Sequence, residues 1–289
     1  MKDHNQHEIQ MSEAFLNSAF LALSGGFQDA YTYNARNEVF CNAQTGNVVL
    51  MSQHFMAGEL TAGLGYFFPI IFFALGVWVA EKIQANYKYA QKLHWRQGVL
   101  LAEILILFTV GFLPTEYNML ANAMASFACA MQVQSFRKVN GYSYASTMCI
   151  GNLRSGTAAL SVYFREKKSK QLKQAMYYFG IILMFALGAG IGGNLSIRYG
   201  IRMIWVSCGF LMISFLLMFI EKYKHSVIKE LASFANGLEK ELDAVENAVA
   251  SELSNGFVEG TNSKVKMVKR TMYGRCGKKL LSAKLMYEL

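Results

Sequence analysis

The sequence has few charged residues, few prolines and no cysteine motif. Charged residues make up 16% of the 289 residues, against about 25% in soluble domains. The two prolines, Pro69 and Pro114, leave long stretches without a helix breaker. The five cysteines are far apart, with no C-x-x-C pair and no neighbouring histidine set. This spacing argues against a structural zinc site and a disulfide framework, and we expect no cofactor.

Long apolar runs take the place of the missing charge. Eight apolar segments lie at about 14–33, 43–57, 62–83, 97–113, 118–136, 144–163, 174–197 and 203–220. Six of them are long enough to cross a bilayer, which takes roughly 17–25 residues. The segments at 43–57 and 144–163 are short or interrupted by polar residues, so we predict that they are re-entrant or interfacial helices.

Short motifs recur in the same order in the two halves of the apolar region. Three pairs are separated by 104 to 112 residues: Gly26-Phe27-Gln28 with Ala130-Met131-Gln132, Thr45-Gly46-Asn47 with Ile150-Gly151-Asn152, and Phe73-Ala74-Leu75-Gly76 with Phe185-Ala186-Leu187-Gly188. Three spans per half is an odd number, so the halves would be inverted relative to each other. Inverted repeats with matching interrupted segments indicate a binding site near the middle of the membrane.

Positive charge predicts the topology. Residues 84–96 and 137–173 are basic, whereas the 114–117 turn has no Lys or Arg and the 34–61 connection has only Arg36. Basic loops stay on the cytoplasmic side, and six spans place both basic segments there. We therefore predict an all-α membrane protein with six transmembrane helices in two weakly similar inverted halves, two short helices, a soluble helical tail and both termini cytoplasmic.

Two motifs near the N-terminus resemble a known family. Gly25-Gly26-Phe27-Gln28-Asp29-Ala30 is followed by Gln44-Thr45-Gly46-Asn47. This arrangement resembles the YoaK family of uncharacterised bacterial inner-membrane proteins over about residues 12–222. The resemblance implies a multi-pass membrane domain, which we assign to residues 1–224, and implies no substrate.

The tail at 225–289 has a different character. Residues 227–252 read as a soluble amphipathic helix, and Ser254-Asn255-Gly256 begins a pattern that ends in Tyr273-Gly274-Arg275. This pattern resembles the C-terminal end of an insertion-sequence transposase with an Asp-Asp-Glu active site. The resemblance implies that Glu259 matches the third metal-binding carboxylate. It also implies that four basic residues match positions near DNA: Lys264, Lys266, Lys269 and Arg270.

Two-metal phosphoryl transfer needs several converging carboxylates. Membrane helices occupy the place where the partner aspartates of Glu259 would lie. We therefore expect a gene fusion with an inert tail, no metal site and no enzyme activity. Nucleic-acid binding by the tail would be non-specific only.

Three ionisable residues within the apolar segments are candidate site residues. An ionisable residue inside a membrane suggests a functional site, and Asp29 and Glu103 fit that description. Asp29 could instead cap the interface, and Glu103 could be structural. Arg154 could bind an anion, or it could simply face water.

Polar residues and glycines complete the candidate substrate site. The Thr45, Gly46 and Asn47 turn could place a helix N-terminus at a ligand, or Gly46 could allow close helix packing. Gly151 and Asn152 are the equivalents in the second half. Gln28 and Gln132 could line a polar path or only hydrogen-bond between helices.

A transporter or channel-like protein for a small solute or ion is the function that we expect. A membrane scaffold without transport activity and a transposase-related DNA-binding remnant are the alternatives. The expected partners are the lipid bilayer and an unknown small solute or ion, and a homo-oligomer remains open.

Overall fold

A computed structural model of the chain describes residues 10–87, 94–224, 232–239 and 241. It divides into two compact units, Met1–Lys222 and Tyr223–Leu289. The described part of the second unit is helical at 232–239. Lys224 Nζ, which precedes this helix, lies 3.1 Å from Glu239 Oε1. Most of the predicted tail helix, and Glu259 with the four basic residues after it, lie outside the described residues.

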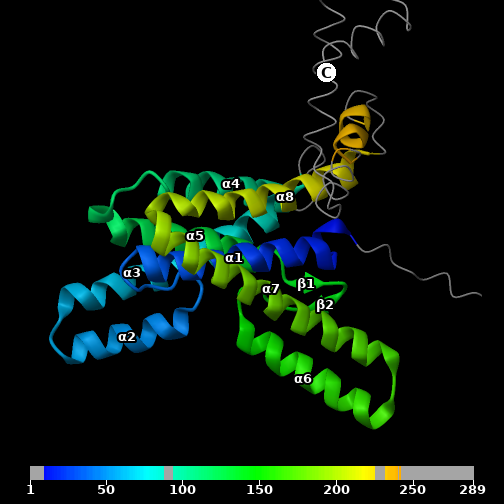
Figure 1. Cartoon of the computed structure of the whole chain (residues 1–289), viewed down its shortest axis with the longest axis horizontal. Helices are drawn as coiled ribbons and strands as arrows, with labels where there is room; N and C mark the ends of the chain where they lie inside the picture. Colours follow the sequence, from blue (N-terminus) through cyan, green and yellow to red (C-terminus); the bar gives the residue numbers. More distant parts are fainter. Residues whose placement is uncertain (1–9, 88–93, 225–231, 240, 242–289) are drawn as a thin grey trace, which may run out of the picture. The chain divides into compact units, whose positions relative to one another are not determined.

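The first unit is helical, as the sequence predicts, and each predicted apolar segment corresponds to one helix (Figure 1). The elements are α1 (Phe15–Ala35), α2 (Gln44–Met56), α3 (Leu60–Tyr87), α4 (Trp95–Val110), α5 (Asn118–Ser135), β1 (Lys138–Val139), β2 (Tyr142–Ser143), α6 (Cys149–Glu166), α7 (Ser169–Tyr199) and α8 (Ile204–Tyr223). Short 3-10 turns lie at Met11–Glu13, Thr115–Tyr117 and Gly200–Met203.

Two helical stretches of the described residues are long and apolar enough to cross a membrane. They are Leu60–Tyr87, with a mean hydropathy of 1.9, and Ser169–Tyr223, with a mean hydropathy of 2.4. By the same measure α4 is short, at 16 residues. Helix α1 carries a series of polar residues that are buried within the unit: Asn17, Ser18, Ser24, Gln28, Asp29 and Thr32. Six spans therefore remain a prediction.

The small β-hairpin is a departure from the all-α prediction. Its two antiparallel strands pair Lys138 with Ser143 and Val139 with Tyr142. The turn residues Asn140 and Gly141 both have positive φ, 46° and 82°, which is what an Asn-Gly hairpin turn requires. Asn140-Gly141 is the sequence signal for this turn.

Helices from one half pack on helices from the other half. Gly188 of α7 lies against α1, where an added Cβ would overlap the carbonyl of Leu23, and Gly26 of α1 lies equally close to the carbonyl of Phe185. Gly76 of α3 lies in the same way against the carbonyl of Phe127 in α5. Gly76 and Gly188 are the last residues of the repeated F-A-L-G motif, so both copies of the motif make an equivalent contact.

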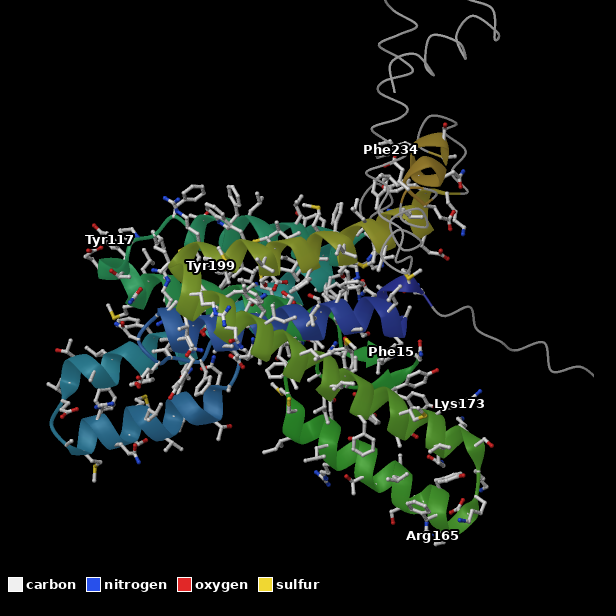
Figure 2. The ribbon with its side chains drawn as sticks, viewed as in Figure 1. Phe15, Tyr117, Arg165, Lys173, Tyr199 and Phe234 are labelled. Carbon is white, nitrogen blue, oxygen red and sulfur yellow. The ribbon has the colours of Figure 1, made fainter. Side chains whose placement is uncertain are left out.

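The two short helices each pair with the long helix that follows them. Helix α2 packs on α3, and α6 packs on α7. Both hairpins lie on the lower side of the unit in Figure 1, with α1, α4, α5 and α8 above them. Figure 2 shows Arg165 and Lys173 at the turn between α6 and α7, and Tyr117 lies at the other end of the unit. The basic segment 137–173 therefore places part of its charge at the α6–α7 turn.

Candidate functional site

A cavity of about 980 Å³ lies where the first turns of α2 and α6 reach α1. We call it the Asp29 cavity. Its walls come from the two loops before the short helices, from the first turns of those helices and from α1, α3 and α7. The lining residues include Asp29, Asn42, Gln44, Thr45, Ile70, Phe73, Thr147, Met148, Ile150, Gly151 and Phe185. Three of the predicted site residues, Asp29, Thr45 and Gly151, therefore meet at one cavity.

Asp29 holds the loop that precedes α2. Its side chain is only 6% exposed, and Oδ1 accepts hydrogen bonds from the backbone N–H of Asn42 at 2.7 Å and from Cys41 Sγ at 3.4 Å. Asn42 Nδ2 also donates to the carbonyl of Gly25, 3.3 Å away. A carboxylate that accepts a backbone N–H is well satisfied. Asp29 therefore fixes the loop before α2 beside α1.

Asn47 and Asn152 make the same contact in the two halves. Asn47 Nδ2 donates to the carbonyl of Phe40 at 2.6 Å, and its Oδ1 accepts from the Phe40 N–H at 3.1 Å. Asn152 does the same with Ala145, at 2.7 Å and 3.4 Å. Each asparagine ties its short helix to the loop before it. Both are buried, so they shape the cavity without lining it.

The first turns of α2 and α6 line the cavity, and the N–H groups of Gln44 and Gly46 in α2 are bonded to the carbonyls of Asn42 and Ala43. No side chain caps either helix: the N-cap residues are Ala43 and Met148, and neither forms a side-chain capping bond. The N-terminal turn of a helix carries a partial positive charge, which favours an anionic or hydrogen-bond-accepting group. The side walls are apolar, with Phe73 and Phe185 from the two copies of the F-A-L-G motif.

Gly46 and Gly151 differ in their surroundings. A Cβ at Gly46 would lie 3.1 Å from the ring of Phe40, whereas a Cβ at Gly151 would have nothing within 4 Å. The sequence led us to expect that bulk would block close backbone approach at both positions. The structure corrects this expectation, because Gly46 faces a side chain and Gly151 faces open space. Close backbone approach occurs instead at Gly26, Gly76 and Gly188.

Gln28 and Glu103 lie away from the Asp29 cavity, in the interior of the bundle. Both side chains have no exposed surface. Gln28 Nε2 lies 3.3 Å from Glu103 Oε1, 2.8 Å from Ser24 Oγ and 3.0 Å from Ser207 Oγ. Its carbonyl oxygen accepts from Cys129 Sγ at 2.6 Å. Gln28 therefore joins α1, α4, α5 and α8 by hydrogen bonds.

The remaining predicted residues lie outside the cavity lining. Gln132 is buried, and it donates to the carbonyl of Leu21 and to Ser146 Oγ at 3.3 Å and 2.9 Å. It connects helices, as one of the two alternatives expected. Arg154 is exposed on α6 and does not line the cavity.

Arg36 forms a buried hydrogen-bond network that the sequence did not predict. Its place in the 34–61 connection suggested an exposed loop residue, yet its side chain is completely buried. Its guanidinium donates to Asn118 Oδ1 at 2.9 Å, to the Val110 carbonyl at 2.8 Å and to the Tyr31 hydroxyl at 3.0 Å. Arg36 therefore connects the end of α1 to the α4–α5 turn. Val110 ends α4, and C-terminal carbonyls carry partial negative charge, which offsets the cation.

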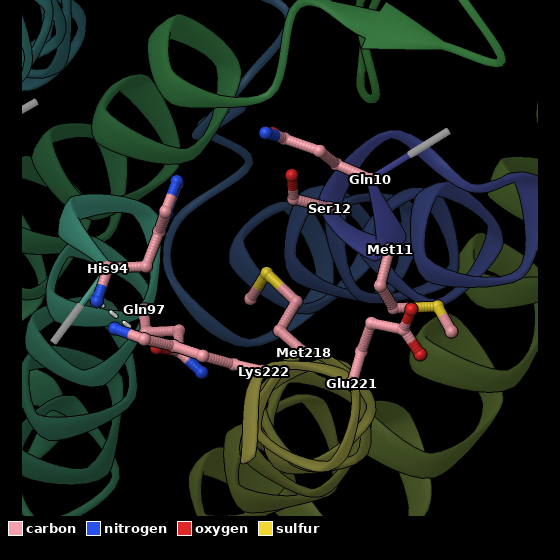
Figure 3. Close-up of a pocket in the computed structure, with 8 residues that line it drawn as sticks. All are labelled: Gln10, Met11, Ser12, His94, Gln97, Met218, Glu221 and Lys222. Atoms are coloured by element: carbon pink, nitrogen blue, oxygen red, sulfur yellow. Dashed lines mark hydrogen bonds between the residues drawn. The ribbon is translucent and has the colours of Figure 1, made fainter. Parts of the chain in front are cut away.

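A second cavity, of about 450 Å³, lies beyond the N-terminal end of α1 (Figure 3). Met11, His94, Met218 and Glu221 are among its lining residues. Burial lowers the pKa of His94, and the neighbouring Arg96 lowers it further, in keeping with His94 Nδ1 accepting the Arg96 N–H at 3.3 Å. None of the predicted site residues lines this cavity.

The residues missed at the site are Cys41, Asn42, Cys129, Thr147 and Ser207. Asn42 and Thr147 lie just before the two short helices, so the repeat that predicted those helices also gave their position. Cys129 and Ser207 enter through contacts between residues at least 88 positions apart, whereas Cys41 lies 12 positions from Asp29. No local pattern signals such contacts.

Comparison with known proteins gives two family matches. The family described as "Protein of unknown function (DUF1275)" matches residues 18–217. A family described as "Transposase" matches residues 199–281. The chain is also 24% identical over 197 residues to the UPF0700 transmembrane protein YoaK of Bacillus subtilis, covering 65% of this chain and 86% of that protein. No solved structure matches. Both resemblances predicted from the sequence are confirmed.

Proposed function

The chain belongs to the DUF1275 family of proteins of unknown function, and we propose that it passes a small solute or ion across the bacterial inner membrane. The observation that carries this function is the meeting of two helix N-termini, those of α2 and α6, at one cavity. Broken helices whose N-termini face each other near the middle of a membrane are a common design of solute sites in transporters. A secondary transporter and a channel both fit this arrangement.

We infer that α2 and α6 are re-entrant half-helices. The loop before α2 contacts α1 at Gly25 and Asp29, inside the helix, and the cavity reaches Phe73 and Phe185 near the middle of α3 and α7. The matching contacts of Asn47 and Asn152 and those of Gly76 and Gly188 support an internal duplication. Six spans with both termini cytoplasmic follow from the same duplication and from the basic segments.

The Gly151→Leu variant tests this function. A leucine at 151 meets no neighbour within 4 Å, and Leu favours a helix over Gly by about 0.5–1 kcal/mol, so we expect no loss of stability. The side chain would occupy the Asp29 cavity, and flux should fall to the rate of empty liposomes. The measurement is light-scattering flux of glycerol, acetate and glycine into proteoliposomes. Gly190→Leu, on α7 and also without neighbours, should leave flux unchanged.

Two outcomes would favour another function, and a third would show that solute takes another path. A co-purifying protein partner, with no flux of any solute in the wild type, would indicate a membrane scaffold. Strand transfer on DNA would indicate a transposase. Normal flux in Gly151→Leu would show that the Asp29 cavity is not the path.

We infer that the tail is an inert remnant of a gene fusion. The transposase match at 199–281 begins within the DUF1275 match and continues past its end. Truncation after Lys224 removes none of the helices α1–α8, and we expect the membrane insertion and thermal unfolding temperature of the full chain to persist. Glu259→Gln in the full chain should likewise change neither. A fall in unfolding temperature on truncation would mean that the tail stabilises the first unit.

A further inference from the structure

Glu103 is a buried acid without a matching base. It lies on α4 with no exposed surface, its Oε1 is 3.3 Å from Gln28 Nε2, and its Oε2 has no hydrogen-bond partner. Among the ion pairs of the described residues, none involves Glu103. One weak hydrogen bond from an amide is little compensation for a buried negative charge.

The free-energy cost of burying a charged carboxylate decides whether Glu103 is ionised or protonated. Burying an ion without a partner costs several kcal/mol even after relaxation, whereas a neutral carboxylic acid with one unpaired oxygen costs about 1–3 kcal/mol. A metal ion in place of the proton would need the position between Glu103, Ser24 and Ser207. Gln28 Nε2 already occupies that position. A proton is therefore the ligand that fits.

A chain of close polar contacts leads from Glu103 to the Asp29 cavity, in which the single S–H of Cys129 donates to Gln28 and not to Cys41. Gln28 accepts from Cys129 Sγ, Cys129 Sγ is 3.5 Å from Cys41 Sγ, and Cys41 Sγ is 3.4 Å from Asp29 Oδ1. The groups that face Glu103 are therefore Gln28 and Ser24 on α1, Cys129 on α5, and Ser207 with Cys208 on α8. The titratable groups among them are thiols, and Asp29 is the acid at the other end of the chain.

We propose that Glu103 is a proton-binding site whose occupancy is coupled to Asp29, so that solute passage through the Asp29 cavity is proton-linked. The link to solute passage rests on the function proposed above, whereas proton binding at Glu103 does not. Two carboxyl groups in one water-poor region disfavour each other's ionised form. Asp29 has a backbone N–H to stabilise its charge and Glu103 has none, so the negative charge resides on Asp29 while Glu103 holds the proton. Loss of that proton would favour proton uptake at Asp29 and release of the loop before α2.

Infrared spectroscopy of the full chain tests the proton site. A protonated carboxylic acid has a carbonyl stretching band that a carboxylate lacks. We expect this band at pH 7 in the wild type and its loss in Glu103→Gln, which keeps the shape of the neutral acid. Glu116→Gln, at an exposed position in the α4–α5 turn, is the matched control and should keep the band. A spectrum unchanged by Glu103→Gln would show that Glu103 is ionised and would overturn the proton site.

Thiol labelling tests the coupling without any transported solute. Ile150 lines the cavity and is 85% exposed. The Ile150→Cys variant would be labelled with a thiol reagent over a range of pH, in a protein that also carries Cys149→Ser. The labelling rate of Ile150→Cys would be divided by that of Met56→Cys, a cysteine at the exposed end of α2. We expect this ratio to change with pH in the protein that has Glu103 and to be independent of pH in Glu103→Gln. Equal pH profiles in both would overturn the coupling. If both tests succeed and no solute moves, the transport function fails and the proton site stands.

Discussion

Gly188→Leu is expected to prevent the first unit from folding. A side chain at 188 would overlap the carbonyl of Leu23 in the backbone of α1, and backbone in a packed helix cannot turn aside as a flexible side chain can. We expect a loss above about 4 kcal/mol, in the range of the most damaging single substitutions. Even Gly188→Ala should be strongly destabilising. The measurement is the monodisperse fraction in detergent together with the thermal unfolding temperature.

The matched control for this variant lies two residues along the same helix. Gly190→Leu adds the same side chain at a position with no neighbour within 4 Å, and it should fold as the wild type does. Gly26→Leu, on the opposite side of the contact, should fail as Gly188→Leu does. A well-folded Gly188→Leu protein would mean that α1 and α7 are not packed through this glycine.

Arg36→Met is expected to lower the free energy of unfolding by about 1–3 kcal/mol, the cost of leaving a buried acceptor without a donor. The substitution would leave Asn118 Oδ1 without the donor that it has now, whereas the Val110 carbonyl would keep the N–H of Leu113 at 3.2 Å. Arg36→Lys should recover only part of the loss, because an ammonium lacks the planar fork that reaches several acceptors at once. Denaturation in detergent monitored by circular dichroism would measure both.

Arg198→Met serves as the control for the Arg36 variants. Arg198 is exposed near the end of α7, and its removal takes away the same charge without opening a buried network. We expect a change within about 0.5 kcal/mol. If Arg36→Met and Arg198→Met lowered stability equally, the loss would come from net charge and not from the buried contacts of Arg36.

Six of the eight helices of the first unit could be predicted from the sequence because each corresponds to a long apolar run. The two short helices were also predictable, since Thr45-Gly46-Asn47 and Ile150-Gly151-Asn152 mark equivalent interruptions. Helix boundaries differ from the predicted ones by a few residues, as at α3, which continues to Tyr87 through polar residues after 83. Hydropathy weakens there while the backbone hydrogen bonds of the helix continue.

The candidate site was only half predictable. Asp29, Thr45 and Gly151 were named from motifs, and the structure brings them to one cavity. Glu103 and Gln28 were named for the same site, yet they pair with each other in the interior. The pairing joins helices 75 residues apart in sequence, and hydrophobic periodicity carries no information about which helices become neighbours. The burial of Arg36 was missed for the same reason.

The packing of helices from one half on helices from the other half has a consequence for synthesis at the membrane. Helix α1 leaves the ribosome about 160 residues before the segment of α7 that covers Gly26. At about 5–20 residues per second, that interval lasts roughly ten to thirty seconds. During this time Asn17 and Gln28 lack the partners Ser214 and Ser207 that they later find on α8. On the proposed six-span topology, a copy of α1 released into lipid before the second half arrives would expose these two groups, so we expect the insertion machinery to retain α1 until then.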